Sequence, residues 1–548
     1  MNKKKSSLLV FLLILFTIPS FFYLLRPGLP ATQDGEDYLI RLAAFHRCLR
    51  DFQIPPRFAG QLNYTYGYPI FNFLYPFFYY IGEIFYLAGF SLILSAKSLL
   101  ILSFIFSSFF MYIFSREFFP KIPSVLASIF YVYAPYRFTD VYIRGSFGEA
   151  IAFVFIPLIF WSISRIFKTS QKKYIATGGF SLAALIMSHN VIAFIFSPII
   201  IAFICLCLYK QRKTKLLFQS LKHSISLLTL SLGLSCFFWL PAILEIKFTI
   251  FSQTRVSTFF EYFPKFSHLF LPFLKDFPQA PGFEGTTALQ VGPLHTLAIL
   301  LSSFFIFKKG KKRRWPFFFF IILILSFFLM NPISTNFWKI KSIHQFVQFP
   351  WRLLSVVCFT ASFLSAFVLS QIKTKERQIL ILSILIPLII FTNKDNLRPK
   401  YYLLKDDNFY FTNDSTTVTQ NEYLPPWVKN PPSKAPPKKI ETQAQYQIAK
   451  QKSNLLEFTI LTKGPTSVVI NTIYYPGWDL FINNQKKAIN YEKSGLIEFN
   501  PPQGESKITL KFKETYLRLF SDIITLISFL FLICLLLPKT SKSHPTTF

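Results

Sequence analysis

Long apolar stretches separated by short basic segments organise this chain from end to end. Several stretches run for roughly 20 residues, the length that an α-helix needs to cross a hydrocarbon core of about 30 Å. We therefore expect a polytopic α-helical membrane protein with about twelve spans. The predicted spans are 6–25, 94–115, 122–136, 149–167, 174–188, 191–209, 223–244, 291–307, 315–330, 351–372, 378–391 and 517–537.

Basic residues flank these stretches in seven clusters, and a single inside or outside assignment places all of them on one side of a membrane. The clusters are Lys3 to Lys5, Arg116 with Lys121, Arg165 to Lys173, Lys210 to Lys222, Lys308 to Arg314, Lys373 to Arg377, and Lys539 with Lys542. Short loops rich in Lys and Arg remain cytoplasmic, because translocating them is unfavourable. The pattern predicts a multi-pass protein of the cytoplasmic membrane with both termini inside.

One further stretch, 68–90, is nearly as apolar as the predicted spans. If it crossed the membrane, the turn that holds Arg116 and Lys121 would move outside and break the charge pattern. Its many aromatic residues, its prolines and Glu83 suit a helix that lies at the outer interface, and we prefer that interpretation. The membrane domain then covers residues 1–392, with outer segments at 26–93, 137–148, 245–290 and 331–350.

The C-terminal part of the chain is more polar. Residues 393–453 are rich in proline and predict an extracytoplasmic linker. Short alternating runs broken by turn residues predict a small β-sandwich over residues 454–514. The runs are 455–461, 467–475, 479–483, 496–500 and 507–513. A final transmembrane helix and a cytoplasmic tail are expected over residues 515–548.

Composition agrees with a membrane protein, since 52% of the 548 residues are hydrophobic and 70 are Phe. A net charge of +32 could suggest nucleic acid. The basic residues lie at span ends, however, which is typical of topology signals and of contact with anionic lipids, so we expect no nucleic-acid partner. Five of the six cysteines fall in apolar spans, so neither a disulfide framework nor a CxxC metal site is predicted.

The first outer segment holds the densest group of ionisable residues. They are Asp34, Glu36, Asp37, Arg41, His46, Arg47, Arg50, Asp51 and Arg57. Three carboxylates just past a span, near several arginines, could supply a general base beside a phosphate-binding surface. On charge alone, a solvated turn with surface ion pairs is the simpler interpretation.

The second outer segment changes that balance, because Asp140, Arg144 and Glu149 lie between two spans at the same membrane level. His189, at a break between spans, and Arg352, at the start of another, reach the same level. Ionisable groups at membrane depth are costly to hold and are functional candidates for that reason. The alternatives are a hydrogen-bonded packing histidine at 189 and a snorkelling arginine at 352.

Together these segments resemble the GT-C superfamily of membrane glycosyltransferases. More closely they are similar to the bacterial and archaeal membrane family labelled 6-pyruvoyl-tetrahydropterin synthase-related, and the β-domain resembles YfhO-type proteins. The matching motifs are Gln33-Asp34-Gly35-Glu36, Pro55-Pro56-Arg57, Tyr66-Gly67-Tyr68-Pro69, Ala134-Pro135-Tyr136-Arg137, Tyr142-Ile143-Arg144-Gly145 with Glu149, Ser188-His189-Asn190, Phe349-Pro350-Trp351-Arg352 and Tyr475-Pro476-Gly477-Trp478.

The GT-C resemblance implies transfer of a sugar from a polyprenyl-phosphate carrier to an extracytoplasmic glycan, lipid or protein acceptor. Asp34 matches the first-loop acid and is the expected catalytic base, and Asp140 or Glu149 matches the second-loop acid. The expected substrate-binding residues are Glu36, Asp37, His46, Arg57, Asp140, Arg144, Glu149, His189 and Arg352. Many relatives carry a histidine before the first acid, where this chain has Gln33. The use of a divalent metal therefore stays open, and no cofactor is expected.

The pterin label finds no support in the residues, because a pterin synthase needs clustered histidines for zinc and the seven here are scattered. Two other functions remain open. A flippase or transporter of a lipid-linked substrate would favour charges at mid-depth and an internal repeat. A non-catalytic scaffold would tolerate neutralisation of the first-loop carboxylates. The charges instead gather at the outer ends of the spans, which favours the transferase.

Overall fold

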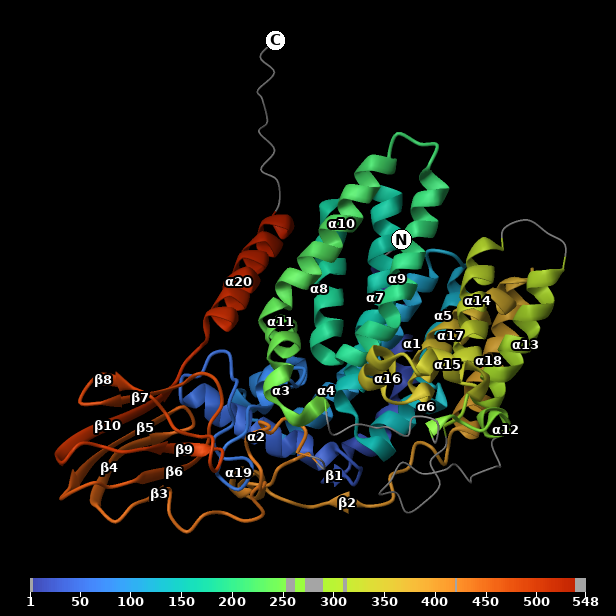
Figure 1. Cartoon of the computed structure of the whole chain (residues 1–548). Coiled ribbons are helices and arrows are strands. Elements are labelled where there is room, and N and C mark those ends of the chain that lie inside the picture. Colours follow the sequence, from blue (N-terminus) through green and yellow to red (C-terminus); the bar gives the residue numbers. More distant parts are fainter. Residues whose placement is uncertain (1–2, 253–261, 272–288, 309–312, 419–420, 538–548) are drawn as a thin grey trace.

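The computed structural model describes residues 3–252, 262–271, 289–308, 313–418 and 421–537. Figure 1 shows a bundle of helices with two small sheets below one side of it. The predicted basic cluster at Lys539 and Lys542 lies outside the described residues, as do residues 309–312 of another cluster and most of the predicted outer segment 245–290.

A helix occupies every range that the hydropathy pattern predicts as a span. The helices are α1 (Lys3–Phe21), α4 (Leu92–Ser115), α5 (Lys121–Val132), α7 (Phe147–Thr169), α8 (Lys172–Ser188), α9 (Asn190–Gln211), α10 (Leu217–Leu234), α11 (Cys236–Glu245), α13 (Pro293–Phe307), α14 (Arg314–Leu329), α17 (Leu354–Ser370), α18 (Lys375–Thr392) and α20 (Tyr516–Leu536). The predicted span 223–244 is bent by 68° between α10 and the helical segment that follows it.

In the described part of the chain, 5 helices are long and apolar enough to cross a membrane. The number rises to as many as 7 if each bent pair of helices counts as one span. The connection between α9 and α10 and the C-terminal end of α20 lie at the top of Figure 1, and the sheets lie at the bottom. Below, "outer" means the end of the bundle that faces the sheets.

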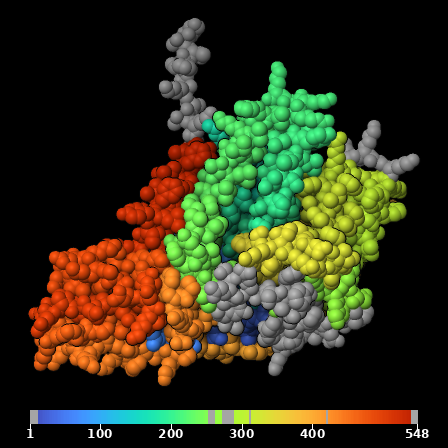
Figure 2. Space-filling model, viewed as in Figure 1, coloured from blue at the N-terminus to red at the C-terminus, as the bar shows by residue number. Residues whose placement is uncertain are grey.

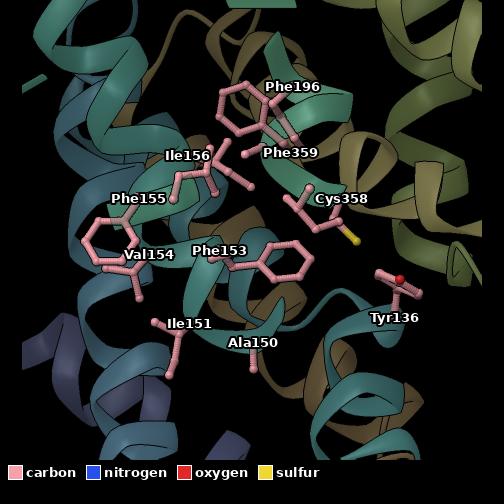
Figure 3. Close-up of a cluster of buried hydrophobic side chains, with 14 of the residues drawn as sticks. Tyr136, Ala150, Ile151, Phe153, Val154, Phe155, Ile156, Phe196, Cys358 and Phe359 are labelled. Atoms are coloured by element: carbon pink, nitrogen blue, oxygen red, sulfur yellow. The ribbon is translucent and has the colours of Figure 1, made fainter. Parts of the chain in front are cut away.

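Helix α7 lies at the centre of the bundle. Its most apolar segment is 83% buried, because other helices pack around it. Figure 3 shows Ile156 of this helix beside Phe359 of α17 and Phe196 of α9. The ring of Phe359 is 4.9 Å from that of Phe160, which lies about two helical turns beyond Phe153 on α7. This packing holds the outer end of α7 in a defined position.

The stretch 68–90 contains only one α-helix, α3 (Phe77–Leu87). Its 11 residues extend for about 16 Å, which is too short for a crossing of about 30 Å. Helix α3 packs against α2 (Gly35–Arg50), which carries the first-loop charges. The two helices are joined through His46 and Glu83, whose Nδ1 and Oε1 atoms are 2.8 Å apart.

Two antiparallel sheets form the C-terminal domain and share one apolar core. Alternate residues of β10 point inward, as a half-buried strand requires. The first sheet has the order β3 (Ile440–Glu441), β6 (Val468–Ile473) and β9 (Leu496–Phe499). The second has the order β4 (Gln445–Lys452), β5 (Leu455–Thr462), β10 (Gly504–Phe512), β7 (Trp478–Ile482) and β8 (Gln485–Lys487).

The predicted linker 393–453 contains more structure than its composition indicates: β2 (Tyr402–Leu403), α19 (Asp407–Thr412), β3 and β4. Strand β4 is the largest difference from the prediction. It lies at the edge of its sheet, and almost all of its side chains are exposed. Because most of its residues are exposed, its sequence carries little of the alternation of apolar and polar residues that reveals a strand.

The sheets are attached to the bundle through Glu245, at the end of α11. Its carboxylate accepts hydrogen bonds from Arg518 of α20 at 2.8 Å, from Asn72 at 2.7 Å and from the hydroxyl of Tyr475 at 3.1 Å. We call these four residues the Glu245 junction. In Figure 2 the final helix α20 forms a column beside α10 and α11, above the sheets.

Candidate functional site

Arg144 is the centre of a buried group of charged and aromatic side chains at the outer end of α7. Its Nη1 atom donates to Glu149 at 2.9 Å and also to Asp140. The hydroxyl of Tyr136 donates to the other oxygen of Glu149 at 2.6 Å. The guanidinium lies 4.5 Å from the centre of the Trp351 ring. We call these five residues the Arg144 cluster.

The backbone around Arg144 explains how the cluster forms. Residues Pro135–Thr139 make a short α-helix, α6, and Asp140–Arg144 continue it as one π-helical turn, η3. Gly145 then adopts a φ of +69°, which L side chains rarely adopt. A Cβ at this position would also meet the side chain of Thr32 at 2.3 Å, so glycine permits the two outer loops to touch.

The first outer loop is hydrogen-bonded to this turn. The backbone N–H of Asp34 donates to the carbonyl of Arg144 at 2.9 Å, and that of Gln33 donates to the carbonyl of Ile143 at 3.0 Å. The Asp34 residue is exposed, whereas Arg144 is 9% exposed and Asp140 is fully buried. The exposed residue Asp34 is therefore joined through its backbone to the turn that carries the buried Arg144, although the two residues are far apart in the sequence.

Tyr75 and His189 line the neighbouring side of the site. The hydroxyls of Tyr75 and Tyr38 are 2.8 Å apart and share a hydrogen bond. The ring of Tyr75 is 5.0 Å from that of His189. His189 accepts the N–H of Ile192 through Nδ1, which caps α9, and its Nε2 atom lies 3.9 Å from Glu149. His189 thus has a capping role and also faces the Arg144 cluster.

Arg352 reaches the site from the start of the α17 segment, in the 3-10 turn η8 (Pro350–Leu353). Its Nη1 atom donates to the carbonyl of Val347 at 2.7 Å, and its buried Nε has no partner among the described residues. Burial raises the pKa of the Tyr75 hydroxyl. The negative charge of Asp34 raises this pKa further, whereas the positive charge of Arg352 lowers it. Asp34 and Arg352 therefore act on the same hydroxyl.

Burial also changes the acid strength of two carboxyl groups at the site. It raises the pKa of Asp140 well above its usual range, against the opposing effect of Arg144, and one Asp140 oxygen has no partner in the described chain. Burial raises the pKa of Asp37 to about 6, and Arg41, whose nearest nitrogen is 3.8 Å away, opposes this shift. Asp37 therefore changes charge close to neutral pH.

The remaining predicted residues lie elsewhere. Glu36 forms an ion pair with Lys405 of the linker at 2.5 Å. His46 contacts Glu83 between α2 and α3. Arg57 binds Asp522 of α20 at 2.8 Å and Glu514 at 3.3 Å. Neither His46 nor Arg57 contacts the Arg144 cluster, and their partners give them roles in packing.

Sequence reasoning did not single out Tyr38 and Tyr75. Both stand among many aromatic residues, and a tyrosine at a site has the same local pattern as one in a core. The hydropathy pattern therefore contains no signal that separates them from their neighbours. In the described residues, no group of three or more His, Cys, Asp or Glu side chains has the geometry to hold a metal ion.

Residues 71–397 match the model of a family described as "6-pyruvoyl-tetrahydropterin synthase related domain; membrane protein". This match covers more than half of the chain. The chain belongs to this family of membrane proteins. One curated relative, an uncharacterized protein of Lactococcus lactis subsp. cremoris (strain MG1363), is 22% identical over 260 residues. The alignment covers 46% of this chain and 42% of the relative, so the chain spans less than half of that protein.

The chain has partial similarity to two solved structures. Arabinofuranosyltransferase AftD from Mycobacteria is 13% identical with a TM-score of 0.45, over 73% of this chain and 27% of that one. The second is the archaeal oligosaccharyltransferase AglB from Archaeoglobus fulgidus, in complex with an inhibitory peptide and a dolichol-phosphate. It is 15% identical with a TM-score of 0.43, and the match covers 75% of this chain and 56% of that one. This chain covers less than two thirds of either protein.

Proposed function

We propose that this protein transfers a sugar from a polyprenyl-phosphate carrier to an acceptor at the extracytoplasmic face of the cytoplasmic membrane. The hydrogen bond between the backbones of Asp34 and Arg144 supports the proposal most strongly. It holds Asp34, an exposed residue, against the turn that carries the buried Arg144, at the outer end of the helices. A carboxylate and a cationic pocket are the two features that this transfer requires.

In the proposed reaction, the oxygen of an acceptor hydroxyl forms a bond to the anomeric carbon of the sugar. The bond between that carbon and the carrier phosphate oxygen breaks, and the phosphate leaves with the electron pair. Asp34 takes the proton of the acceptor hydroxyl. Arg144 and Arg352 stabilise the negative charge on the departing phosphate.

The hydrogen bonds of the arginines support this assignment. All side-chain hydrogen bonds of Arg144 to described residues use Nη1, which leaves N–H groups on Nε and Nη2 for a phosphate. Asp140 and Glu149 then orient Arg144, and Trp351 covers its flat face. Asp37 and His189 line the edge of the substrate site in this proposal, while Glu36, through Lys405, and also His46 and Arg57 stabilise the fold.

The lipid part of the carrier requires the outer end of the site to lie at the membrane surface. About twelve spans with both termini inside would place the Arg144 cluster and the sheets together on the extracytoplasmic side. The basic clusters at the opposite end would contact anionic lipids of the inner leaflet. The identities of the sugar and of the acceptor depend on the shape of the pocket that receives them.

Asp34→Asn tests the base directly. We expect sugar transfer in reconstituted liposomes to fall by about 10² to 10⁴, the usual contribution of a positioned acid or base. Carrier binding and thermal unfolding should stay unchanged, because the backbone hydrogen bond to Arg144 is retained. Asp395→Asn, at an exposed carboxylate away from the site, is the matched control. A well-folded and fully active Asp34→Asn variant would exclude Asp34 as the base.

Arg144→Lys tests the phosphate site and keeps a positive charge beside Asp140 and Glu149. Lysine cannot donate several hydrogen bonds in one plane, so we expect carrier binding to weaken by roughly tenfold or more. Arg137→Lys is the matched control, because Arg137 is also buried but lies among the rings of Phe104, Tyr131 and Phe153. Equal carrier binding by wild type and Arg144→Lys would contradict the proposal. If the wild type transferred no lipid-linked sugar, a flippase would become the better interpretation.

A further inference from the structure

A second pocket lies at the other end of α2, between the first outer loop and the sheets. Its volume is about 540 Å³, within the range of roughly 300–1,000 Å³ that is typical of small-molecule sites. Its walls come from the end of α2, residues 51–65, the turn between β4 and β5, and Trp478 of β7. We call it the basic pocket.

Positive charge dominates this pocket. Its lining includes Arg47, Arg50, Lys439 and Lys452 but only one carboxylate, Asp51. Asp51 already accepts the N–H of Ser453 at 2.6 Å and lies 4.0 Å from Lys452. Within the described ranges, Arg50 and Lys439 therefore have no carboxylate partner.

Lys439 is the most informative of these cations. Its ammonium donates to the carbonyls of Thr65 at 2.9 Å and Asn471 at 2.8 Å, which leaves one of its three N–H groups. Burial lowers the pKa of Lys439 to about 8, because no opposite charge compensates for the loss of water. An anionic group of a ligand would supply that missing charge.

Uncharged polar groups beside the pocket also lack partners. Both amide atoms of Gln61, the hydroxyl of Ser453 and the indole nitrogen of Trp478 are buried and form no hydrogen bond to the described residues. Buried polar groups in folded proteins are nearly always hydrogen-bonded. A ligand rich in hydroxyl groups would satisfy them, since each hydroxyl both donates and accepts, whereas a simple anion would satisfy the charges alone.

We propose that the basic pocket binds a saccharide carrying carboxylate or phosphate groups. The position of the pocket makes this saccharide the acceptor, a step that rests on the proposed transferase function. Helix α2 begins next to Asp34 and ends at the pocket, and its 16 residues extend for about 24 Å. An acceptor chain held at the basic pocket would therefore reach the candidate base with a sugar several units away. Figure 1 shows α2 between the sheets and the helices above it.

Binding to the full-length protein in nanodiscs tests the proposal, with tetragalacturonate and glucose 6-phosphate as anionic probes and maltotetraose as the neutral one. We expect an anionic probe to bind at least tenfold more tightly than maltotetraose. Lys439→Gln and Arg50→Gln should each weaken that binding by about tenfold, since each removes a charge-assisted hydrogen bond. Lys511→Gln, at an exposed lysine on β10 outside the pocket, should leave it unchanged.

Gln61→Met separates a saccharide site from a simple anion site, because it removes the amide and nearly preserves the volume. We expect it to weaken binding of the anionic saccharide and to leave binding of inorganic phosphate unchanged. Asp34→Asn should bind the probes like the wild type, so a failure of transfer and a failure of this pocket can be told apart. Failure of both anionic probes to bind, equal binding of maltotetraose, or equal affinities of wild type and Lys439→Gln would each overturn the proposal.

Discussion

The Arg144 cluster and the Glu245 junction both pair a buried arginine with a buried glutamate, but they are built differently. In the Arg144 cluster the partners Asp140 and Glu149 lie within five residues of the arginine. In the Glu245 junction the partner of Glu245, Arg518, lies 273 residues along the chain. Arg518 is fully buried, whereas Arg144 is 9% exposed and neighbours the exposed Asp34.

This difference indicates what each group does. A local cluster beside an exposed loop residue can receive a ligand without changing how distant segments pack. A closed junction between distant segments cannot receive a ligand and instead holds α11, α20 and the sheets together. A buried ion pair by itself is weak evidence for stability, because the cost of desolvation opposes the attraction between the two charges. Exposure and sequence separation distinguish the two cases here.

The largest expected effect concerns the side of the membrane on which both regions lie. Cysteines introduced by Ala88→Cys and Lys487→Cys should react with an impermeant thiol reagent in intact cells, because both positions are exposed at the outer end. Lys213→Cys, in the connection between α9 and α10, should react only after permeabilisation. The exposed Cys205 and Cys534 are first replaced by serine. Labelling of Lys213→Cys in intact cells would invert the predicted topology.

The next largest effect is expected from a substitution that disrupts the Glu245 junction and leaves the Arg144 cluster intact. Arg518→Ala leaves the carboxylate of Glu245 buried without its cation, and we expect a loss of about 3–5 kcal/mol in unfolding free energy. Denaturant titration in detergent micelles measures it. Replacing both residues, by Arg518→Met with Glu245→Leu, should cost less because no buried charge remains. If Arg518→Ala proved as stable as the wild type, the junction would not hold the sheets to the bundle.

The smallest effect concerns Asp37, beside the cluster. Burial raises the pKa of this carboxyl from 3.8 to about 6, so the folded protein holds its proton more firmly than the unfolded chain does. Between about pH 4 and pH 6 the group therefore destabilises the fold increasingly as pH rises. Asp37→Asn should raise Tm at pH 7 by roughly 1–2 °C and leave it almost unchanged at pH 4. An equal shift at both pH values would contradict the burial of Asp37.

Hydropathy predicted the helices of the bundle well, because an apolar run of span length has few other stable conformations. Alternating runs predicted β5, β6, β7, β9 and β10, where one face of each strand is buried. The same rule missed β4, most of whose residues are exposed. The pattern of apolar and polar residues predicts a strand only where one face of that strand is buried.

For the site, the sequence by itself determined which residues were available: carboxylates and arginines in outer loops, beside glycines that permit close contact. Only the tertiary structure decided which of them lie at the candidate site and which hold the fold together. Arg57 and Arg144 both lie in charged outer loops, yet the side chain of Arg57 binds Asp522, 465 residues away. The side chain of Arg144 pairs within its own loop, and its backbone carbonyl accepts the N–H of the distant Asp34. The physical reason is that a charge pairs with whatever the packing of distant segments brings within a few ångströms. Spacing along the chain does not encode that packing.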